Sequence, residues 1–339
     1  MKKILILSPL SDQALAVARY IHRYDRFCVL HGGFLPGELL RTASFYKKVL
    51  YVNNANILEN YDIVLPTGAQ STHWMATQFE EFKVNNLSYT KNNLQYFDKI
   101  RVLKRVKDLG IPIPETYETV DAIDAACPLF YKQKYESGGG ARGIAQSQDD
   151  LKKLANKHEL LFQEYIPGPT TYGFGFLVKD NIIVTSFQHA EILSQPVQGG
   201  SAVAIRRYYD DRLKTYTQRI VQNLGFEGWG LAEYKYCTKR RDFVFMEINA
   251  KLWASIEFAF MNNNNFLKYM FDLEYPEVET NSALFIDRLV KLGLKQILRN
   301  SPYFFSSKII RYHSPSMLLR SLITGAVPSR IRQYLKRMF

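Results

Sequence analysis

The stretch FMEINAKLW, residues 245–253, places a polar side chain at every second position of an otherwise apolar run. Glu247, Asn249 and Lys251 would share one face of a β-strand, because side chains two residues apart point the same way. Carboxylate and amide oxygens are ligands that Mg²⁺ takes, and a lysine beside them can meet phosphate charge. The stretch therefore predicts a strand that presents Glu247 and Asn249 to a metal ion and Lys251 to a phosphate. The alternative is an amphipathic strand whose polar face lies in solvent.

A second strand, GLAEYKY at residues 230–236, precedes this one and carries Glu233 and Lys235 on one face. Residues that stand opposite each other on neighbouring strands lie within contact distance. The pattern therefore allows an acidic pair of Glu233 and Glu247 across the two strands, and the alternative is again a polar face in solvent.

A glycine-rich stretch, YKQKYESGGGARGI at residues 131–144, follows a strand. Glycine permits positive φ and close backbone approach, so the N–H groups of such a loop can close over a polyphosphate while a lysine supplies positive charge. The G-K-[ST] ending of a Walker A loop is missing, and a flexible surface loop is the alternative. The residues predicted to contact a nucleotide here are Lys132 or Lys134, Gly138, Gly139, Gly140 and Arg142.

A third stretch, LLFQEYIPG at residues 160–168, leads a strand directly into a Pro-Gly turn. The backbone groups of such a strand end can lie along the edge of a purine and read the base. On its own the stretch is a strand and a turn. The residues predicted to contact the base are Gln163, Glu164, Tyr165 and Ile166.

The order of elements changes near residue 95. Before it, short apolar runs alternate with helical patterns, which predicts a parallel sheet with helices on its faces. Ser11 or Asp12 is the expected N-cap of the first helix. After it, a helix from about Tyr96 to Leu109 is followed mainly by strands, with a hairpin turning at residues 179–181 and one helix capped by Asp210 or Asp211.

The size of the chain, 339 residues, predicts two or three domains. Its three cysteines lie far apart, which favours a reducing compartment over a disulfide scaffold or a zinc site. No stretch approaches the roughly 18 apolar residues of a membrane span. We therefore expect a cytoplasmic protein. Aromatic residues are spread along the chain rather than clustered, which weighs against a platform for single-stranded nucleic acid.

The C-terminal residues carry nearly all of the net charge of +12, because eleven Lys and Arg and no Asp or Glu follow residue 287. Residues 282–299 and the segments near 315 and 328 alternate cations with apolar residues in a helical pattern, interleaved with Tyr303, Phe304 and Phe305. Such helices can lie on an anionic membrane surface, bind another polyanion or acidic partner, or pack on the core. We favour the inner face of the membrane, where a lipid-linked glycan or cell-envelope precursor would be accessible.

Taken together, the ordered motifs resemble those of ATP-grasp ligases over about residues 1–260. MEINAKLW resembles the family's E-x-N-P-R ending, so Glu247 and Asn249 match its metal ligands and Lys251 takes the place of its arginine. Lys99 matches the first ATP lysine. Lys132 matches the second, although Lys134 fits when the loop is counted backward from Arg142.

The resemblance implies an α/β preATP-grasp domain over residues 1–92, which is Rossmann-like, and an α+β ATP-grasp domain of two lobes over residues 93–275. The glycine-rich loop would span residues 135–143, and a basic helical tail would span residues 276–339. Nucleotide would lie between the lobes.

The resemblance also implies ATP and Mg²⁺ as cofactors, and a ligase that joins a small-molecule carboxylate to an amine through an acyl phosphate, releasing ADP and phosphate. Lys251 and Arg206 would be the catalytic residues, and His189 or Arg207 lies where family members line the acceptor or phosphate side. A thioester-forming or carboxylating enzyme of the same fold is an alternative. The sequence does not specify the oligomeric state.

Two departures from the family pattern favour another alternative. Lys235 stands where the family often has a second metal-binding acid, so Glu233 would have to serve instead. Lys251 lacks the bidentate fork that a guanidinium offers to phosphate. A degenerate ATP-grasp module that binds nucleotide or acts as a scaffold without ligase activity is therefore the alternative function.

Overall fold

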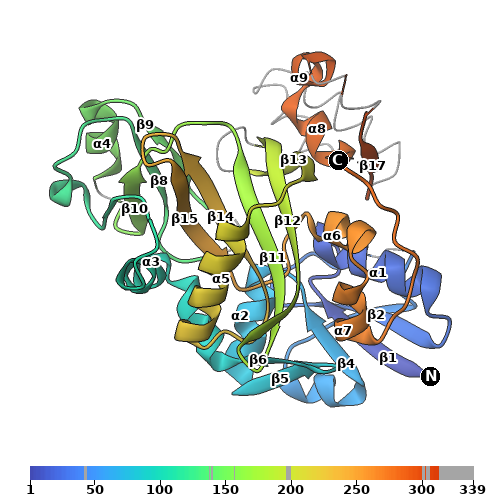
Figure 1. The fold of residues 1–339 in the computed structure, drawn as a ribbon. Coiled ribbons are helices and arrows are strands. Elements are labelled where there is room, and N and C mark those ends of the chain that lie inside the picture. The colour runs from blue at the N-terminus through green and yellow to red at the C-terminus, as the bar shows by residue number, and fades with distance from the viewer. Residues whose placement is uncertain are drawn as a thin grey trace, which may run out of the picture.

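The structure, a computed structural model, describes residues 1–41, 44–136, 138, 140–155, 157–195, 200–299, 302 and 306–312. These residues form four sheets, of which the smallest is a two-stranded hairpin. Figure 1 shows the other three as an N-terminal unit in blue, a small green unit on the opposite side and a large sheet between them. The two units therefore lie at different ends of one large sheet.

The N-terminal unit is a parallel sheet with the strand order β3-β2-β1-β4. Its elements are β1 (Lys2–Leu7), α1 (Asp12–Tyr24), β2 (Cys28–Phe34), β3 (Lys48–Tyr51), the 3₁₀ helix η1 (Ala55–Asn60), β4 (Ile63–Pro66) and α2 (Ala69–Gln78). The alternation of strands and helices seen in the sequence is confirmed. Ser11 caps α1, and its Oγ accepts a hydrogen bond from the Ala14 N–H at 3.2 Å.

A two-stranded hairpin and a helix connect this unit to the rest of the chain. They are β5 (Glu81–Val84), β6 (Leu87–Thr90), the 3₁₀ helix η2 (Lys91–Phe97) and α3 (Lys99–Asp108). The Asp98 carboxylate caps α3 by accepting a hydrogen bond from the Arg101 N–H at 3.0 Å. Lys99 consequently stands in the first turn of α3.

The small unit is an antiparallel sheet with the order β7-β10-β8-β9. Its elements are β7 (Thr116–Tyr117), the 3₁₀ helix η3 (Val120–Ala122), β8 (Leu129–Gln133), β9 (Arg142–Ala145), α4 (Gln148–Leu154) and β10 (Leu160–Glu164). The glycine-rich stretch connects β8 to β9. Strand β9 was not predicted, because its four residues include a glycine and are too few to show a period.

The large sheet has the order β15-β14-β11-β12-β13-β16-β17. Its first five strands and one helix are β11 (Thr171–Lys179), β12 (Ile182–Gln195), β13 (Ser201–Arg207), α5 (Asp211–Leu224), β14 (Gly228–Cys237) and β15 (Asp242–Asn249). The predicted hairpin turn is confirmed, with Asp180 and Asn181 at φ values of 55° and 59°. The α5 caps are confirmed as well, with Asp210 at the start and Gly225 in the left-handed region at φ 62°.

The C-terminal elements correct one prediction. They are α6 (Ile256–Asn262), α7 (Asn265–Phe271), β16 (Ser282–Phe285), α8 (Ile286–Leu289), the 3₁₀ helix η4 (Val290–Leu292), α9 (Leu294–Arg299) and β17 (Lys308–Ile310). The helical tail expected over residues 276–339 is wrong at residues 282–285 and 308–310, where β16 and β17 extend the large sheet, whereas α8, η4 and α9 are helical as predicted. Ala283, Leu284 and Phe285 are at most 1% exposed, so both faces of β16 are covered, which a surface helix does not require. Tyr303, Phe304, Phe305 and residues 313–339 lie outside the described residues.

No helix within the described part of the chain is long and apolar enough to cross a membrane.

Candidate nucleotide and substrate cleft

Three parts of the chain enclose a cleft of about 560 Å³, here called the central cleft. The small sheet contributes β8 and the loop to β9, and the large sheet contributes one face of β14 and β15. The carboxyl ends of β1, β2 and β4 form the third wall, which is where parallel α/β sheets commonly bind ligands.

Glu247 of β15 is the centre of an ion-pair network in this cleft. The Lys132 Nζ atom lies 2.8 Å and the Lys99 Nζ atom 3.2 Å from Glu247 Oε2. The Asn249 side-chain amide donates a hydrogen bond to Glu247 Oε1 at 3.3 Å. Lysines from α3 and β8 therefore converge on β15.

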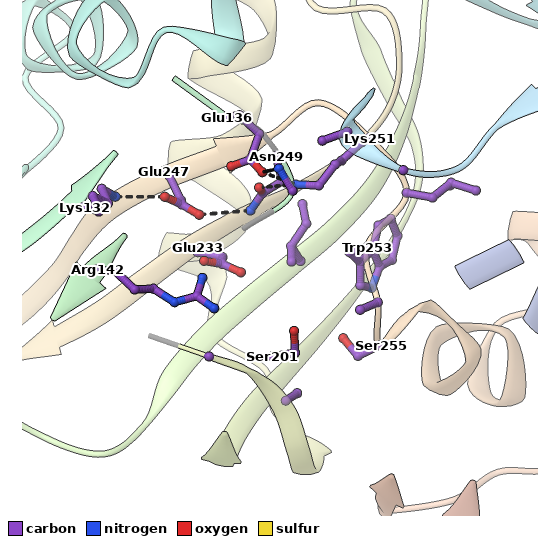
Figure 2. Close-up of a pocket in the computed structure, with 18 of the residues that line it drawn as sticks. Lys132, Glu136, Arg142, Ser201, Glu233, Glu247, Asn249, Lys251, Trp253 and Ser255 are labelled. Carbon is purple, nitrogen blue, oxygen red and sulfur yellow. Dashed lines mark hydrogen bonds and ion pairs between the residues drawn. The ribbon is translucent and has the colours of Figure 1, made fainter. Parts of the chain in front are cut away.

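Glu136, which the sequence analysis did not single out, joins this network from the β8–β9 loop. Its carboxylate lies 3.1 Å from Lys99 Nζ and 3.2 Å from Lys251 Nζ, and Lys251 also donates to Asn249 Oδ1 at 2.6 Å. Figure 2 shows Glu136 and Lys251 side by side next to Asn249. Its position two residues before the first of three glycines was the only signal in the sequence.

The charges of this network perturb one another. Burial would raise the pKa of Glu247, but the ammonium groups of Lys132 and Lys99 outweigh it and hold that pKa well below its usual range. Burial lowers the pKa of Lys132. For Lys99, burial would lower the pKa, yet Glu247 and Glu136 raise it above its usual range. The network thus keeps Glu247 ionised and Lys99 protonated although both side chains are largely buried.

Glu233 of β14 stands directly across from Glu247 in the register of the two strands. Its carboxylate accepts no hydrogen bond from a described residue, and burial, followed by repulsion from Glu247 and Glu191, raises its pKa well above its usual range. Figure 2 shows Glu233 and Arg142 extending into the same hollow beside Glu247. A bound cation would offset the negative charge of this unpartnered carboxylate.

The donor set fits Mg²⁺ in kind, since Glu233, Glu247 and Asn249 offer hard oxygen atoms within one cleft. Among the described residues, no group of three or more His, Cys, Asp and Glu side chains is placed to hold a metal ion. Protein oxygens would therefore supply only part of a coordination shell, which suits an ion that also binds phosphate and water.

Lys235 does not compete at this position. Its Nζ atom donates to the backbone oxygens of Gly168 and Thr170, at 2.9 and 3.4 Å, in the turn after β10. Although Lys235 lines the cleft, its ammonium group is directed toward that turn, and burial lowers its pKa.

The glycine-rich loop lies at the cleft as predicted for Gly138 and Arg142, both of which line it. Gly138 and Gly140 have φ values of 78° and 100°, a region that favours glycine. The Gly138 N–H donates to Glu136 at 2.8 Å, which ties the loop to the ion-pair network. Gly139 lies outside the described residues.

Several predicted site residues do not line the central cleft. Lys134 lines a separate surface hollow, because β8 ends at Gln133 and the chain bends before Lys134. Arg206 is exposed on β13 and is not among the residues that line the central cleft in the described part of the chain.

The strand end that was predicted to contact the base does not line the cleft either. Gln163 is buried and donates to Thr116 Oγ1 at 3.2 Å, and Glu164 is paired with Arg240. Tyr165 is half-buried, and Ile166 packs in a small apolar cluster. None of the four lines the cleft.

The apolar lining and the contribution of the N-terminal unit were not predicted from the sequence. Phe130 and Met246 line the cleft beside Lys132 and Glu247, and they read as ordinary strand residues in the sequence. Ser8 and Glu38 line it from loops that follow β1 and β2, and Gln70 lines it from the first turn of α2, after β4. Polar residues in such loops carry no periodic signal, and only the parallel topology brings them together.

Comparison with known proteins agrees with this architecture. Residues 96–255 match the family model described as the ATP-grasp domain. None of the curated proteins matches the sequence.

Solved structures share the fold at low sequence identity. The chain is similar to a biotin carboxylase–β,γ-ATP complex from Campylobacter jejuni, with a TM-score of 0.60, 14% identity, and 82% of this chain and 72% of that one covered. It is similar to N5-carboxyaminoimidazole ribonucleotide synthetase from Thermotoga maritima, with a TM-score of 0.59, 14% identity, and coverage of 82% and 78%. It also resembles pyruvate carboxylase from Rhizobium etli, with a TM-score of 0.60 and 13% identity over 78% of this chain, and it spans only 27% of that longer chain.

The family match covers the strand lysines, the glycine-rich loop and both carboxylate-bearing strands of the central cleft. Residues 96–255 therefore form an ATP-grasp domain.

Proposed function

We propose that this protein is an ATP-dependent ligase that joins a carboxylate to an amine through an acyl phosphate and releases ADP and phosphate. The observation that carries the proposal is the convergence of Lys99, Lys132 and Lys251 on the carboxylate-bearing strand β15, within one cleft. Cations fixed in a site with little water stabilise the charge that develops during phosphoryl transfer.

In this proposal Lys99, Lys132, Lys251 and Arg142 bind the phosphates of ATP, and Glu233, Glu247 and Asn249 hold Mg²⁺, which would screen the phosphate charge. The base lies toward Phe130 and Met246, which line the cleft beside Lys132 and Glu247. Arg206 is left out of the catalytic set because of its exposed position on β13.

Two steps follow for the substrates. A carboxylate oxygen of the first substrate attacks the γ-phosphorus, and the bond between that phosphorus and the ADP oxygen breaks. The amine nitrogen of the second substrate then attacks the acyl carbon. The bond from that carbon to the bridging oxygen breaks, phosphate leaves with this oxygen, and the amine nitrogen releases one proton. The loop between β8 and β9 would shield the acyl phosphate from water.

The proposal includes a division of the chain. Residues 1–92 form a preATP-grasp domain, residues 93–275 the ATP-grasp domain, and residues 276–339 a basic C-terminal part. The parallel N-terminal sheet and the coverage of about four fifths of the chain by similar structures support this division.

The test is a screen for ADP release with Mg²⁺, ATP and pools of carboxylates and amines. The proposal requires ADP release that depends on both a carboxylate and an amine, and on Mg²⁺. A protein that binds ATP yet releases no ADP with any pair would instead be the degenerate module, for which Lys251 in place of an arginine is the motivating feature.

For the basic C-terminal part, we propose that it lies on the inner face of an anionic membrane and brings the ligase to a glycan or cell-envelope precursor. Lys291, Arg299 and Lys308 are exposed, which leaves their charges available. Deletion of residues 313–339 should abolish sedimentation with anionic liposomes while sparing ATP binding. Equal sedimentation of the truncated protein would contradict this role.

A further inference from the structure

Positive side chains line only one part of the central cleft within the described chain. The cations of the lining come from the ATP-grasp domain and are Lys99, Lys132, Arg142, Lys235 and Lys251. The polar lining from the N-terminal unit contains no cation and consists of Ser8, Ser11, Gln13, Glu38 and Gln70. The phosphates of ATP therefore have their charge partners on the side of the ATP-grasp domain. The end of the cleft next to the N-terminal unit must recognise a different group.

Arg288 gathers three chain segments at this second end. Its guanidinium donates to the Ala202 backbone oxygen, to the Ala254 backbone oxygen at 2.8 Å and to Asp12 Oδ2 at 2.7 Å. Each of these three acceptors stands next to a serine that lines the cleft. The serines are Ser11, Ser201 and Ser255. Arg288 itself is only 4% exposed and its charge is matched by Asp12, so it is not a free cation for an anionic ligand.

Two of these hydroxyls have no partner within the described residues. Neither the Ser201 nor the Ser255 side chain forms a hydrogen bond there, and Ser255 is only 4% exposed. Figure 2 shows both hydroxyls at one end of the cleft, away from Lys132 and Glu247. They are free to bind the hydroxyl groups of a ligand.

Glu38 is the carboxylate of this end, and a turn fixes it. Residues 35–38 form a turn closed by the Glu38 N–H donating to the Leu35 backbone oxygen at 3.0 Å. Pro36 and Gly37, with φ of 90° at Gly37, are the residues that a type II turn prefers at its two centres. The half-buried Glu38 side chain is thereby held at the carboxyl end of β2.

The partners of the Glu38 carboxylate are neutral. Ser8 Oγ donates to Oε1 and the Leu35 N–H donates to Oε2, both at 2.7 Å. Ser8 adopts a left-handed backbone with φ of 53°, which is uncommon for a residue other than glycine. No described Lys, Arg or His forms an ion pair with Glu38, and each oxygen retains a lone pair. A negative charge that faces a cleft with only neutral donors favours a cationic ligand.

We infer that this end of the cleft binds the acceptor as a hydroxyl-bearing primary amine, with the ammonium group on Glu38 and the hydroxyls on Ser201 and Ser255. The inference rests on the proposed ligase function and names the class of its amine substrate, of which amino sugars are the simplest members. An anionic acceptor would meet Glu38 without a compensating cation.

The experiment is calorimetric titration of the full-length protein with matched pairs that differ only in an amino group. The pairs are glucosamine and glucose, galactosamine and galactose, and ethanolamine and ethylene glycol. At least one amine should bind about tenfold more tightly than its hydroxyl counterpart. Glu38→Gln should remove that difference, whereas Glu59→Gln, on the exposed face of η1, should preserve it.

A separate titration with a non-hydrolysable ATP analogue and Mg²⁺ shows that each variant is folded and tests the ligase proposal independently. Absence of ATP-analogue binding to the wild type would overturn the ligase function, whether or not the amines bind. Equal binding of amines and their counterparts, an amine preference that survives Glu38→Gln, or no amine binding in the wild type would overturn the inference.

Discussion

Two lysines two residues apart meet different environments at the end of β8. Lys132 is 7% exposed and is paired with Glu247, whereas Lys134 lies beyond the strand and lines a surface hollow with Asp98 and Glu118. When polyphosphate enters the cleft, the Lys132 ammonium group can exchange its carboxylate partner for a phosphate oxygen at little cost in desolvation. The Lys134 ammonium group cannot reach it without unpairing the end of β8.

We therefore predict that Lys132→Met weakens binding of an ATP analogue at least tenfold, or about 1.4 kcal/mol. Lys134→Met is the matched control and should change the dissociation constant less than twofold. Calorimetric titration of both variants is the measurement. A larger effect from Lys134→Met would contradict the assignment of the second ATP lysine.

Glu233 gives a prediction with a defined pH dependence for the metal-free protein. Its pKa is raised in the folded state by burial and by Glu247 and Glu191, compared with about 4.3 in the unfolded chain. The unfolded state therefore loses this proton first as the pH rises, and folding stability falls between the unfolded and the folded pKa. Below the unfolded pKa the carboxyl is protonated in both states and the penalty vanishes.

Glu233→Gln should accordingly raise the melting temperature relative to wild type at pH 8 and leave it unchanged near pH 3.5, with EDTA present. Added Mg²⁺ and ATP should stabilise the wild type more than this variant. Glu59→Gln serves as the control for loss of one negative charge. A variant that melts below the wild type at pH 8 would show that Glu233 is not a strained carboxylate.

At the scale of elements, two glycines of β11, Gly173 and Gly175, leave room for neighbouring aromatic rings. A Cβ atom on Gly173 would lie 2.4 Å from the His189 ring, and one on Gly175 would lie 2.4 Å from the Trp253 ring. The glycines thus let two rings lie flat across the middle of the large sheet. Trp253 directly follows Leu252 at the cleft wall, so this packing fixes the chain that carries Lys251.

Gly175→Ala should destabilise the protein by about 1–3 kcal/mol, since a Cβ atom 2.4 Å from the Trp253 ring forces that buried ring or the strand to shift. Urea unfolding followed by Trp fluorescence measures this change. Gly68→Ala is the control, because a Cβ there meets nothing nearer than 3.5 Å and its φ is −94°. Equal destabilisation by both substitutions would contradict the packing argument.

Local patterns predicted the elements of the ATP-grasp domain well. The period of two placed Glu247 and Asn249 on β15, although the strand ends at Asn249 and Lys251 follows it. The Gly225 and Asp210 signals set the ends of α5. Strand β9 was missed because its four residues are too few to show a period. The role of Glu136 was missed because its contact with Lys99 joins residues distant in sequence. Counting backward from Arg142 left Lys134 as an alternative to Lys132, because the end of β8 at Gln133 leaves no mark in the sequence.

At the scale of the whole molecule, the C-terminal segment fastens the N-terminal unit to the large sheet. The sequence showed Arg288 as one cation of an amphipathic helix, but it is buried and bridges Asp12 of α1 to the backbone of Ala202 and Ala254. Further along, Ile310 is 1% exposed and the Tyr312 N–H donates to Asp287 at 2.6 Å. Helical periodicity could not reveal this, because the partners lie up to 276 residues away.

Arg288→Ala should destabilise the protein by about 3–5 kcal/mol, as expected when one partner of a buried ion pair is removed and the other charge remains. The exposed Arg299 provides the control, since Arg299→Ala should change stability by less than about 0.5 kcal/mol. Denaturant unfolding monitored by circular dichroism compares the two. A small effect at Arg288 would show that the C-terminal segment is only loosely attached.

The most direct test of the account is calorimetric titration of a non-hydrolysable ATP analogue with Mg²⁺ into the wild type and into a Glu247→Ala/Asn249→Ala variant. We predict magnesium-dependent binding in the wild type that weakens at least tenfold in the double variant, because the strand that holds the ion has lost its oxygen ligands. Absence of binding in the wild type, or equal binding in both proteins with and without Mg²⁺, would contradict the assignment of the central cleft.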